Sequence, residues 1–202
     1  MEELLKDLKK KVWITKCCRF NASKRYGIHN IYANLSTAIL ACYVVILNIC
    51  QLVITVQDHV INNRITAITI GISVFLLAIT LYIWARDFSV KAVSFHDCGR
   101  DLASFESKID ILLAEKTNNI TKEQIEELSR EYNTILNRYE NHENIDLLNL
   151  YNECKSDFPE RVGKSECWYN LKVKVDFFFQ VYFVYFLLLI GIPLVSILLL
   201  FV

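Results

Sequence analysis

The stretch Ile31–Gln57, IYANLSTAILACYVVILNICQLVITVQ, contains no charged residue over 27 positions. About 20 apolar residues suffice to cross the ~30 Å hydrocarbon core of a bilayer, so this stretch predicts a membrane-spanning helix. Its polar residues are aligned, because small and polar side chains recur every seven positions. The two rows are Asn34, Ala41, Asn48 and Thr55, and Thr37, Val44 and Gln51. A period of 3.5 residues places both rows on one face of the helix.

This polar face comprises Asn34, Thr37, Asn48, Gln51 and Thr55. Lipid cannot satisfy the hydrogen bonds of amides and hydroxyls, so the face is expected to contact protein or water. Two interpretations remain open. The side chains line or flank a conducting path through an oligomer, or they bond helix to helix, each contributing on the order of 1 kcal/mol.

Two further stretches are long and apolar enough to span. Ile65–Trp84 and Phe177–Val202 are both free of charged residues. The second of these begins with an aromatic belt suited to the headgroup boundary, and Gly191 and Pro193 predict a kink within it. A buried core helix is the alternative for this third stretch, but the rest of the chain offers too little apolar surface to bury it. We therefore expect three spans.

The charges are distributed in blocks, although 22 basic and 22 acidic residues balance overall. Residues 1–30 carry eight Lys and Arg, whereas the 58–64 loop carries one. By the positive-inside rule we expect the N-terminus and the middle segment to lie in the cytoplasm, with the spans in the inner (plasma) membrane. The seven cysteines then lie in membrane or reducing cytoplasm, and we expect free thiols. Cys17 and Cys18 are either acylated or simply buried.

Heptad spacing predicts that the middle segment is a helical hairpin. Two heptad rows start at Phe88 and Lys91 and are apolar apart from Lys91, and they predict that the second span continues unbroken to Ala114. A break follows at 116–120, and a capping box at 121–124 opens a second helix. The seam of that second helix is Ile125, Leu128, Tyr132, Ile135, Tyr139 and His142. A short helix over 145–158 should end at Pro159 and Gly163.

The first 27 residues show apolar side chains at helical spacing with Lys and Arg on the other face. This amphipathic helix either rests on anionic headgroups or packs against the cytoplasmic hairpin. The fold class is therefore an all-α membrane protein, in which a transmembrane hairpin extends into a cytoplasmic antiparallel coiled coil. Its parts are a basic helix at 1–30, the transmembrane hairpin at 31–84, the cytoplasmic hairpin and connector at 85–174, and a third transmembrane helix at 175–202.

Motifs of enzymes are absent from the sequence: it has no Gly-rich phosphate loop, no nucleophile elbow, no H-E-x-x-H and no Cys-x-x-Cys. His96 and Cys98 are two apart on a helix and point away from each other, so they do not predict a metal site. Asp146 lies four residues after His142, which fits either a self-satisfied network at a helix end or a ligand-binding or catalytic role. We predict no enzyme, no cofactor and no metal.

Two motifs resemble those of a known family. Trp13-Ile-Thr15-Lys16-x-x-Arg19-x-x-Ala22-x-x-Arg25, directly before a membrane hairpin, resembles the start of SLATT domains, and Tyr139-Glu-Asn141-His142-x-x-x-Asp146 resembles their late cytoplasmic motif. The resemblance covers about residues 8–150 and is nearest to the reverse-transcriptase-associated subgroup. Two departures are the third span and Tyr26, which stands where Leu is expected.

The resemblance implies a membrane effector of bacterial anti-phage defence. We therefore expect a homo-oligomer that forms a gated pore and disrupts the membrane once a separate cytoplasmic sensor is triggered. A nucleotide synthase, a SLOG-type protein or a reverse transcriptase would be that sensor, and direct binding of a cyclic nucleotide has no motif to support it. The alternative is a non-conducting scaffold or receptor that recruits a soluble partner through the coiled coil. Structural or regulatory roles are implied for Trp13, Thr15, Arg19, Ala22, Arg25, Asn141, His142 and Asp146.

Overall fold

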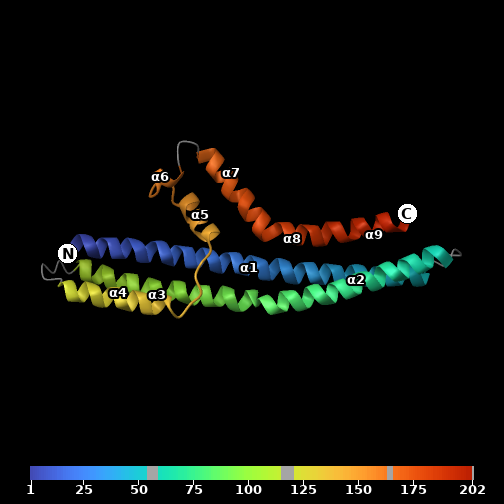
Figure 1. The fold of residues 1–202 in the computed structure, drawn as a ribbon, viewed down its shortest axis with the longest axis horizontal. Helices are drawn as coiled ribbons and strands as arrows, with labels where there is room; N and C mark the ends of the chain where they lie inside the picture. Colours follow the sequence, from blue (N-terminus) through green and yellow to red (C-terminus); the bar gives the residue numbers. More distant parts are fainter. Residues whose placement is uncertain (54–58, 115–120, 163–165, 202) are drawn as a thin grey trace. The chain divides into compact units, whose positions relative to one another are not determined.

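A computed structural model describes residues 1–53, 59–114, 121–162 and 166–201, and within these ranges the chain forms helices and no strands (Figure 1). The predicted all-α class is therefore confirmed. The helices are α1 (Glu2–Val53), α2 (His59–Arg86), α3 (Phe88–Ala114), α4 (Lys122–Leu136), α5 (Asn144–Glu153), α6 (Pro159–Val162), α7 (Glu166–Phe177), α8 (Phe183–Phe186) and α9 (Ile192–Phe201), with π-helical turns η1 (Phe178–Tyr182) and η2 (Leu187–Gly191).

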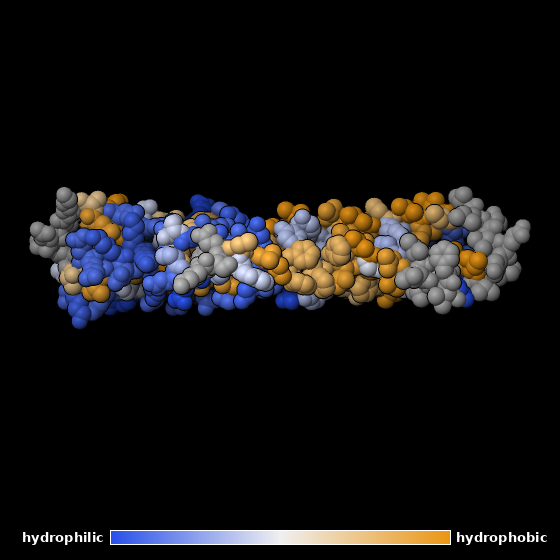
Figure 2. All heavy atoms as spheres, turned by 90° about the horizontal axis from the view of Figure 1, so that it is seen from above, coloured by the Kyte–Doolittle hydropathy of each residue, from blue (hydrophilic) through white to orange (hydrophobic). Residues whose placement is uncertain are grey.

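The helices form two compact units. The polar unit comprises Met1–Gly27 and Ser89–Asp176, and the membrane unit comprises Ile28–Phe88 and Phe177–Val202. Helix α1 contributes to both, since it extends as one helix from Glu2 to Val53. Hydrophobic residues gather over the helices of the membrane unit and hydrophilic residues over those of the polar unit (Figure 2).

Three helical segments are long and apolar enough to cross a membrane, which identifies a membrane protein: Glu2–Leu52, Ile61–Ala114 and Cys167–Ser196. In the most apolar 18-residue window of each, only 11%, 11% and 17% of the residues are buried inside the protein. A core helix would bury most of such a window, so the third segment is not a core helix. Its apolar surface needs lipid or another protein to cover it.

Inside the membrane unit, α1 packs through small residues. Ala33 and Ser36 are fully buried, and Ala33 and Leu40 form an apolar cluster with Tyr185 and Leu188 of the third segment. Small side chains let helix backbones approach closely in lipid. The kink expected at Gly191 and Pro193 coincides with a local irregularity, because the π-helical turn η2 ends at Gly191.

In the polar unit, α1, α3 and α4 share one apolar core. Its buried members are Leu5, Val12, Cys98, Leu102, Phe105, Ile109, Leu128, Tyr132 and Ile135. From Cys98 onward, the heptad rows that predicted the seam of α3 thus face this core. The first part of α1 also packs here, with Leu5 and Val12 fully buried, rather than resting on headgroups through these residues. The capping box at the start of α4 is present, with Thr121 and Gln124 bonded in both directions.

The expected unbroken helix through the second span is wrong. Asp87 has a φ of 49° and separates α2 from α3. Asp is one of the few residues that adopt this left-handed conformation readily, because its short side chain can bond locally. A heptad pattern continues across a single such residue without any visible interruption.

Two other helix boundaries also differ from expectation. Helix α4 ends at Leu136, so Tyr139 and His142 are not on its seam but in the connector 137–143. Helix α5 ends at Glu153, well before Pro159, which instead begins α6. Proline is favoured in the first turn of a helix, where its missing N–H is not needed. The predicted break at 116–120 and Gly163 lie outside the described residues.

Candidate functional site

Two arginines of α1 lie in the apolar packing of the polar unit. Arg19 follows Leu5 and Val12 at intervals of seven, so it occupies a core position of the same heptad row. Its exposed fraction is 0%, and that of Arg25 is 4%. A buried charge is tolerated only when paired and hydrogen-bonded, so the partners of these two residues define the site.

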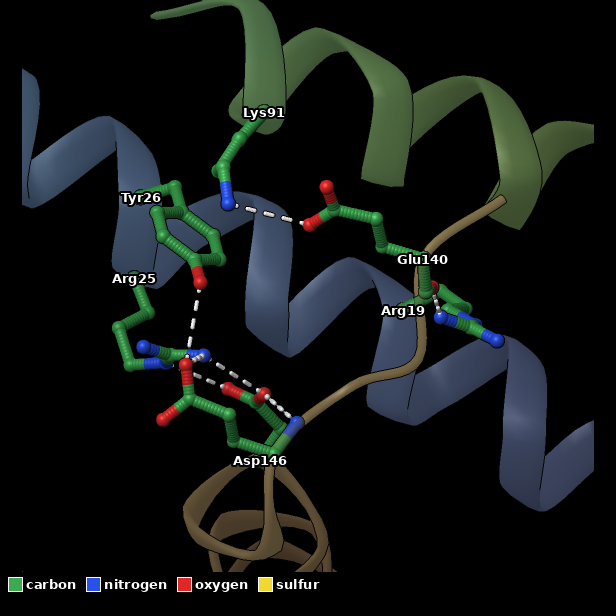
Figure 3. Close-up of polar contacts among 7 residues, drawn as sticks. Arg19, Arg25, Tyr26, Lys91, Glu140 and Asp146 are labelled. Carbon is green, nitrogen blue, oxygen red and sulfur yellow. Dashed lines mark hydrogen bonds and ion pairs between the residues drawn. The ribbon is translucent and has the colours of Figure 1, made fainter. Parts of the chain in front are cut away.

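Arg25 forms a two-pronged ion pair with Asp146, the third residue of α5 (Figure 3). Its Nε donates to Oδ1 at 2.9 Å and its Nη2 donates to Oδ2 at 3.1 Å. Asp146 is fully buried. The planar guanidinium matches the carboxylate in this geometry, which is the strongest class of charged hydrogen bond.

Asp146 also caps the N-terminus of α5. Its Oδ2 accepts the backbone N–H of Glu143 at 3.0 Å, as expected of a carboxylate at the N-terminus of a helix. The Glu143 carboxylate in turn lies 3.1 Å from Arg25 Nη2 and accepts the Tyr26 hydroxyl at 3.0 Å. Asn21 donates to the Asp146 carbonyl at 3.2 Å. The Asp146 carboxylate thus fixes both the start of α5 and the attachment of α5 to α1.

Arg19 holds the connector 137–143 directly. Its guanidinium donates to the Glu140 carbonyl and, at 3.1 Å, to Oδ1 of Asn141. The Glu140 side chain then pairs with Lys91 of α3 at 3.1 Å (Figure 3). We call Arg19, Arg25, Asn141, Glu143 and Asp146 the arginine cluster. It attaches the α4–α5 connector and the first turn of α5 to α1.

Burial and charge shift several pKa values around the cluster. Burial acts to lower the pKa of Arg25, but its hydrogen bonds to Asp146 and the charge of that carboxylate outweigh this and raise it. Burial, with a further contribution from Asp146, raises the pKa of Cys18 to about 12, so this thiol is unreactive. Since Cys18 is fully buried, it fits the second of the two interpretations of the cysteine pair.

The other motif residues pack around the cluster rather than joining it. Trp13 stacks on Phe158 with ring centroids 6.1 Å apart, and the hydroxyls of Thr15 and Tyr132 lie 2.8 Å apart. Ala22 is fully buried. The contacts of Trp13 and Thr15 join α1 to other segments of the polar unit.

His142 does not use Asp146 as its partner, contrary to one interpretation of their spacing. The carboxylate is engaged by Arg25, and the Nδ1 atom of His142 is buried without a hydrogen-bond partner among the described residues. Burial and then the charge of Arg19 lower the pKa of His142 below its usual 6.5. The imidazole is therefore held neutral in the folded protein.

The free energy of unfolding is expected to fall at low pH, where His142 becomes protonated. A base with a lowered pKa in the folded state binds more protons when unfolded, so its contribution is present in full above about pH 6.5 and declines as the pH falls below that value. Thermal unfolding of the full chain in detergent between pH 7.5 and 5 measures this. His142→Gln should flatten the decline, and the exposed His96→Gln should not. An unchanged decline in His142→Gln would contradict the assignment.

The polar face of the first span divides into two parts. Gln51 donates to Asn62 Oδ1 at 3.1 Å and to Thr66 Oγ1 at 2.6 Å, so it bonds α1 to α2. Asn34 and Asn48 are exposed, and their bonded partners lie one turn away on α1 itself, at Asn30 Oδ1 and the Val44 carbonyl. Thr37 is half-buried and donates to the Asn34 carbonyl at 2.9 Å. Thr55 lies outside the described residues.

Several residues of the site were not identified from the sequence. They are Asn21, Lys91, Glu140 and Glu143. One signal was available: Arg19 and Tyr26 continue the row of Leu5 and Val12, and a charge in an apolar row demands a buried partner. Among the described residues, no group of three His, Cys, Asp or Glu side chains is arranged to hold a metal ion.

Comparisons with known proteins identify the family but no individual relative. No curated protein and no solved structure matches the chain. One family model matches residues 1–202, and its description names two transmembrane helices, whereas this chain has a third candidate span. The resemblance carried by the two motifs is confirmed, and the chain belongs to the SMODS and SLOG-associating 2TM effector domain family 5.

Proposed function

We propose that this chain is the membrane effector of a bacterial anti-phage defence system and that it forms a gated oligomeric pore in the inner membrane. The observation that carries the proposal is the exposure of Asn34 and Asn48 within a membrane-spanning helix. An amide on the lipid-facing side of a lone helix leaves its remaining donors and acceptors unsatisfied. Assembly around a water-filled path satisfies them.

The division of the polar face supports this assignment of roles. Gln51 stabilises the α1–α2 hairpin within one chain, which is the helix-to-helix role that amides commonly have in membranes. Asn34 and Asn48 have no such partner on α2 or on the third segment among the described residues, so they remain for contacts between copies or with water. Uncharged amides would give little discrimination between ions, because selective filters use charged rings or ordered carbonyls.

The arginine cluster is the proposed site at which a sensor controls the pore. We place the polar unit in the cytoplasm, where a separate sensor reaches it. Since α2 and α3 are interrupted at Asp87, whereas α1 is one helix from the cluster to Asn48, the path from sensor to pore runs through α1. Release of the connector 137–143 from Arg19 and Arg25 is the two-state event that would free α1.

Crosslinking tests assembly through the polar face. In a background with the exposed Cys42, Cys50 and Cys167 replaced by Ser, Ala41→Cys places a thiol in the row of Asn34 and Asn48, whereas Ile46→Cys places one on another exposed face of the same helix. Oxidation in membranes should yield disulfide-linked dimers of the Ala41→Cys protein and few of the Ile46→Cys protein.

Equal crosslinking at both positions, or none at Ala41→Cys, would remove the support for assembly through this face. A protein that crosslinks at Ala41→Cys but never conducts would instead be the non-conducting scaffold or receptor. Both outcomes are decided with the full chain in its membrane, because both thiols are introduced on the exposed surface and leave the α1–α2 contact at Gln51 intact.

A further inference from the structure

Helix α7 buries one face, and among the described residues an apolar stripe on its other face stays exposed. On the covered face Val173 is 2% exposed, and Asn170 accepts a hydrogen bond from Asn152 of α5 at 3.1 Å. On the other face Trp168, Leu171 and Val175 are 71%, 52% and 43% exposed. Their spacing of three and four places them on one stripe of the helix. Isolated exposed apolar residues are ordinary, but a tryptophan-led stripe on a short helix is not.

In the chain, α7 lies directly before the membrane-spanning residues of the third segment. The helix ends at Phe177, which is the residue at which the third segment passes into the membrane unit. At 1.5 Å per residue, Trp168 is within about 14 Å of helix length from that residue. The stripe is therefore close enough to the membrane-spanning residues to reach the headgroup region when α7 lies along the bilayer surface. The same spacing continues into Phe178 and Phe179, which are themselves exposed.

The charges beside the stripe identify the kind of membrane surface. Lys172 and Lys174 lie on exposed positions of α7, and neither has an ion-pair partner among the described residues. A helix with Trp and aliphatic residues on one stripe and lysines at its margins is typical of segments that lie in the interface plane. Lysines near an anionic lipid surface strengthen such binding. Tryptophan itself prefers the headgroup level.

We propose that α7 is an interfacial helix whose Trp168, Leu171 and Val175 stripe inserts among lipid headgroups, with Lys172 and Lys174 bound to anionic lipid. It holds the polar unit against the bilayer at the point where the third segment enters. The third segment, which the two-helix family description does not include, thereby gains a role as a membrane attachment for α5 and, through Asp146, for the arginine cluster.

Fluorescence of Trp168 tests the proposal. The full chain carrying Trp13→Phe and Trp84→Phe is reconstituted in vesicles of phosphatidylcholine with or without phosphatidylglycerol. Phospholipids brominated near the glycerol end of the acyl chain should quench most of the Trp168 emission, and aqueous acrylamide should quench little. In vesicles with phosphatidylglycerol, replacing each lysine by Gln should lower the ratio of docked to undocked helix about fivefold.

The matched control keeps Trp13 alone, by Trp84→Phe and Trp168→Phe. Trp13 stacks on Phe158 in the polar unit, and bromolipids should leave its emission unchanged. Strong acrylamide quenching of Trp168 without bromolipid quenching overturns the proposal, as does protection of Trp168 that appears only after a soluble protein is added. Leu171→Glu, at an exposed position, should release Trp168 while the helix content measured by circular dichroism is retained.

Discussion

Arg25→Met is expected to lower the free energy of unfolding of the polar unit by about 3–5 kcal/mol. The substitution leaves the fully buried Asp146 carboxylate without its two-pronged partner, although the Glu143 N–H still donates to it. Removing one member of a buried ion pair costs much more than the pair itself contributes, because the remaining charge stays desolvated. Chemical or thermal unfolding of the full chain in detergent, followed by circular dichroism, measures the loss.

Two variants make this result specific to the pair. Lys24→Met changes the exposed neighbour on the same helix and should shift stability by no more than about 0.5 kcal/mol. The double variant Arg25→Met with Asp146→Leu removes both charges and should recover a large part of the loss, since an apolar pair of similar volume often replaces a buried ion pair without cost. Asp146→Leu alone is measured as well, and if its loss and that of Arg25→Met simply add in the double variant, the coupling inferred between Arg25 and Asp146 is wrong.

The second large effect is expected in the membrane unit. Replacing both Asn34 and Asn48 with Leu should reduce the ion flux of the activated protein by on the order of tenfold or more, because an apolar lining excludes water from a narrow path. Insertion should be retained, since both residues are exposed and Leu is favourable in lipid. The matched control is Cys42→Leu with Cys50→Leu, two exposed positions on the same helix outside the polar face.

Elements with local signals could be predicted from the sequence. The capping box of Thr121 and Gln124 depends on residues three apart, and the apolar rows of α3 depend on one helix only. The three candidate spans depend on the length and composition of a single segment. In each case the physical cause lies within one segment of the sequence, so the local pattern is enough to predict the element.

Features that depend on contacts between residues far apart in the sequence could not be predicted from local patterns. Arg25 and Asp146 are 121 positions apart, and nothing local in either motif indicates that the two bond to each other. The role of Gln51 depends on the register of α2 against α1, which brings Asn62 and Thr66 within reach. The break at Asp87 depends on one backbone angle, and the surrounding heptads continue through it.

The end of α4 illustrates a competition between local pattern and tertiary contacts. Tyr139 and His142 keep the apolar spacing of the helix, yet the helix ends at Leu136. The backbone carbonyl of Glu140 accepts from Arg19 instead of from a helical N–H, and the Tyr139 hydroxyl donates to Asp101 at 2.8 Å. Contacts with α1 and α3 therefore outweigh the few residues of helix that the spacing alone favours.

Release of the arginine cluster is expected to open a path lined by the polar face of α1. Potassium efflux from vesicles containing the purified full chain tests it most directly, with three proteins at equal density: the unmodified chain, Asp146→Asn, and Asp146→Asn combined with Asn34→Leu and Asn48→Leu. Asp146→Asn weakens the pairing with Arg25 by removing the charge while keeping the shape. Efflux should be faster for Asp146→Asn than for the unmodified chain, and it should be near background for the combined variant. Efflux that never rises in Asp146→Asn, or that persists after both asparagines are replaced, would contradict it.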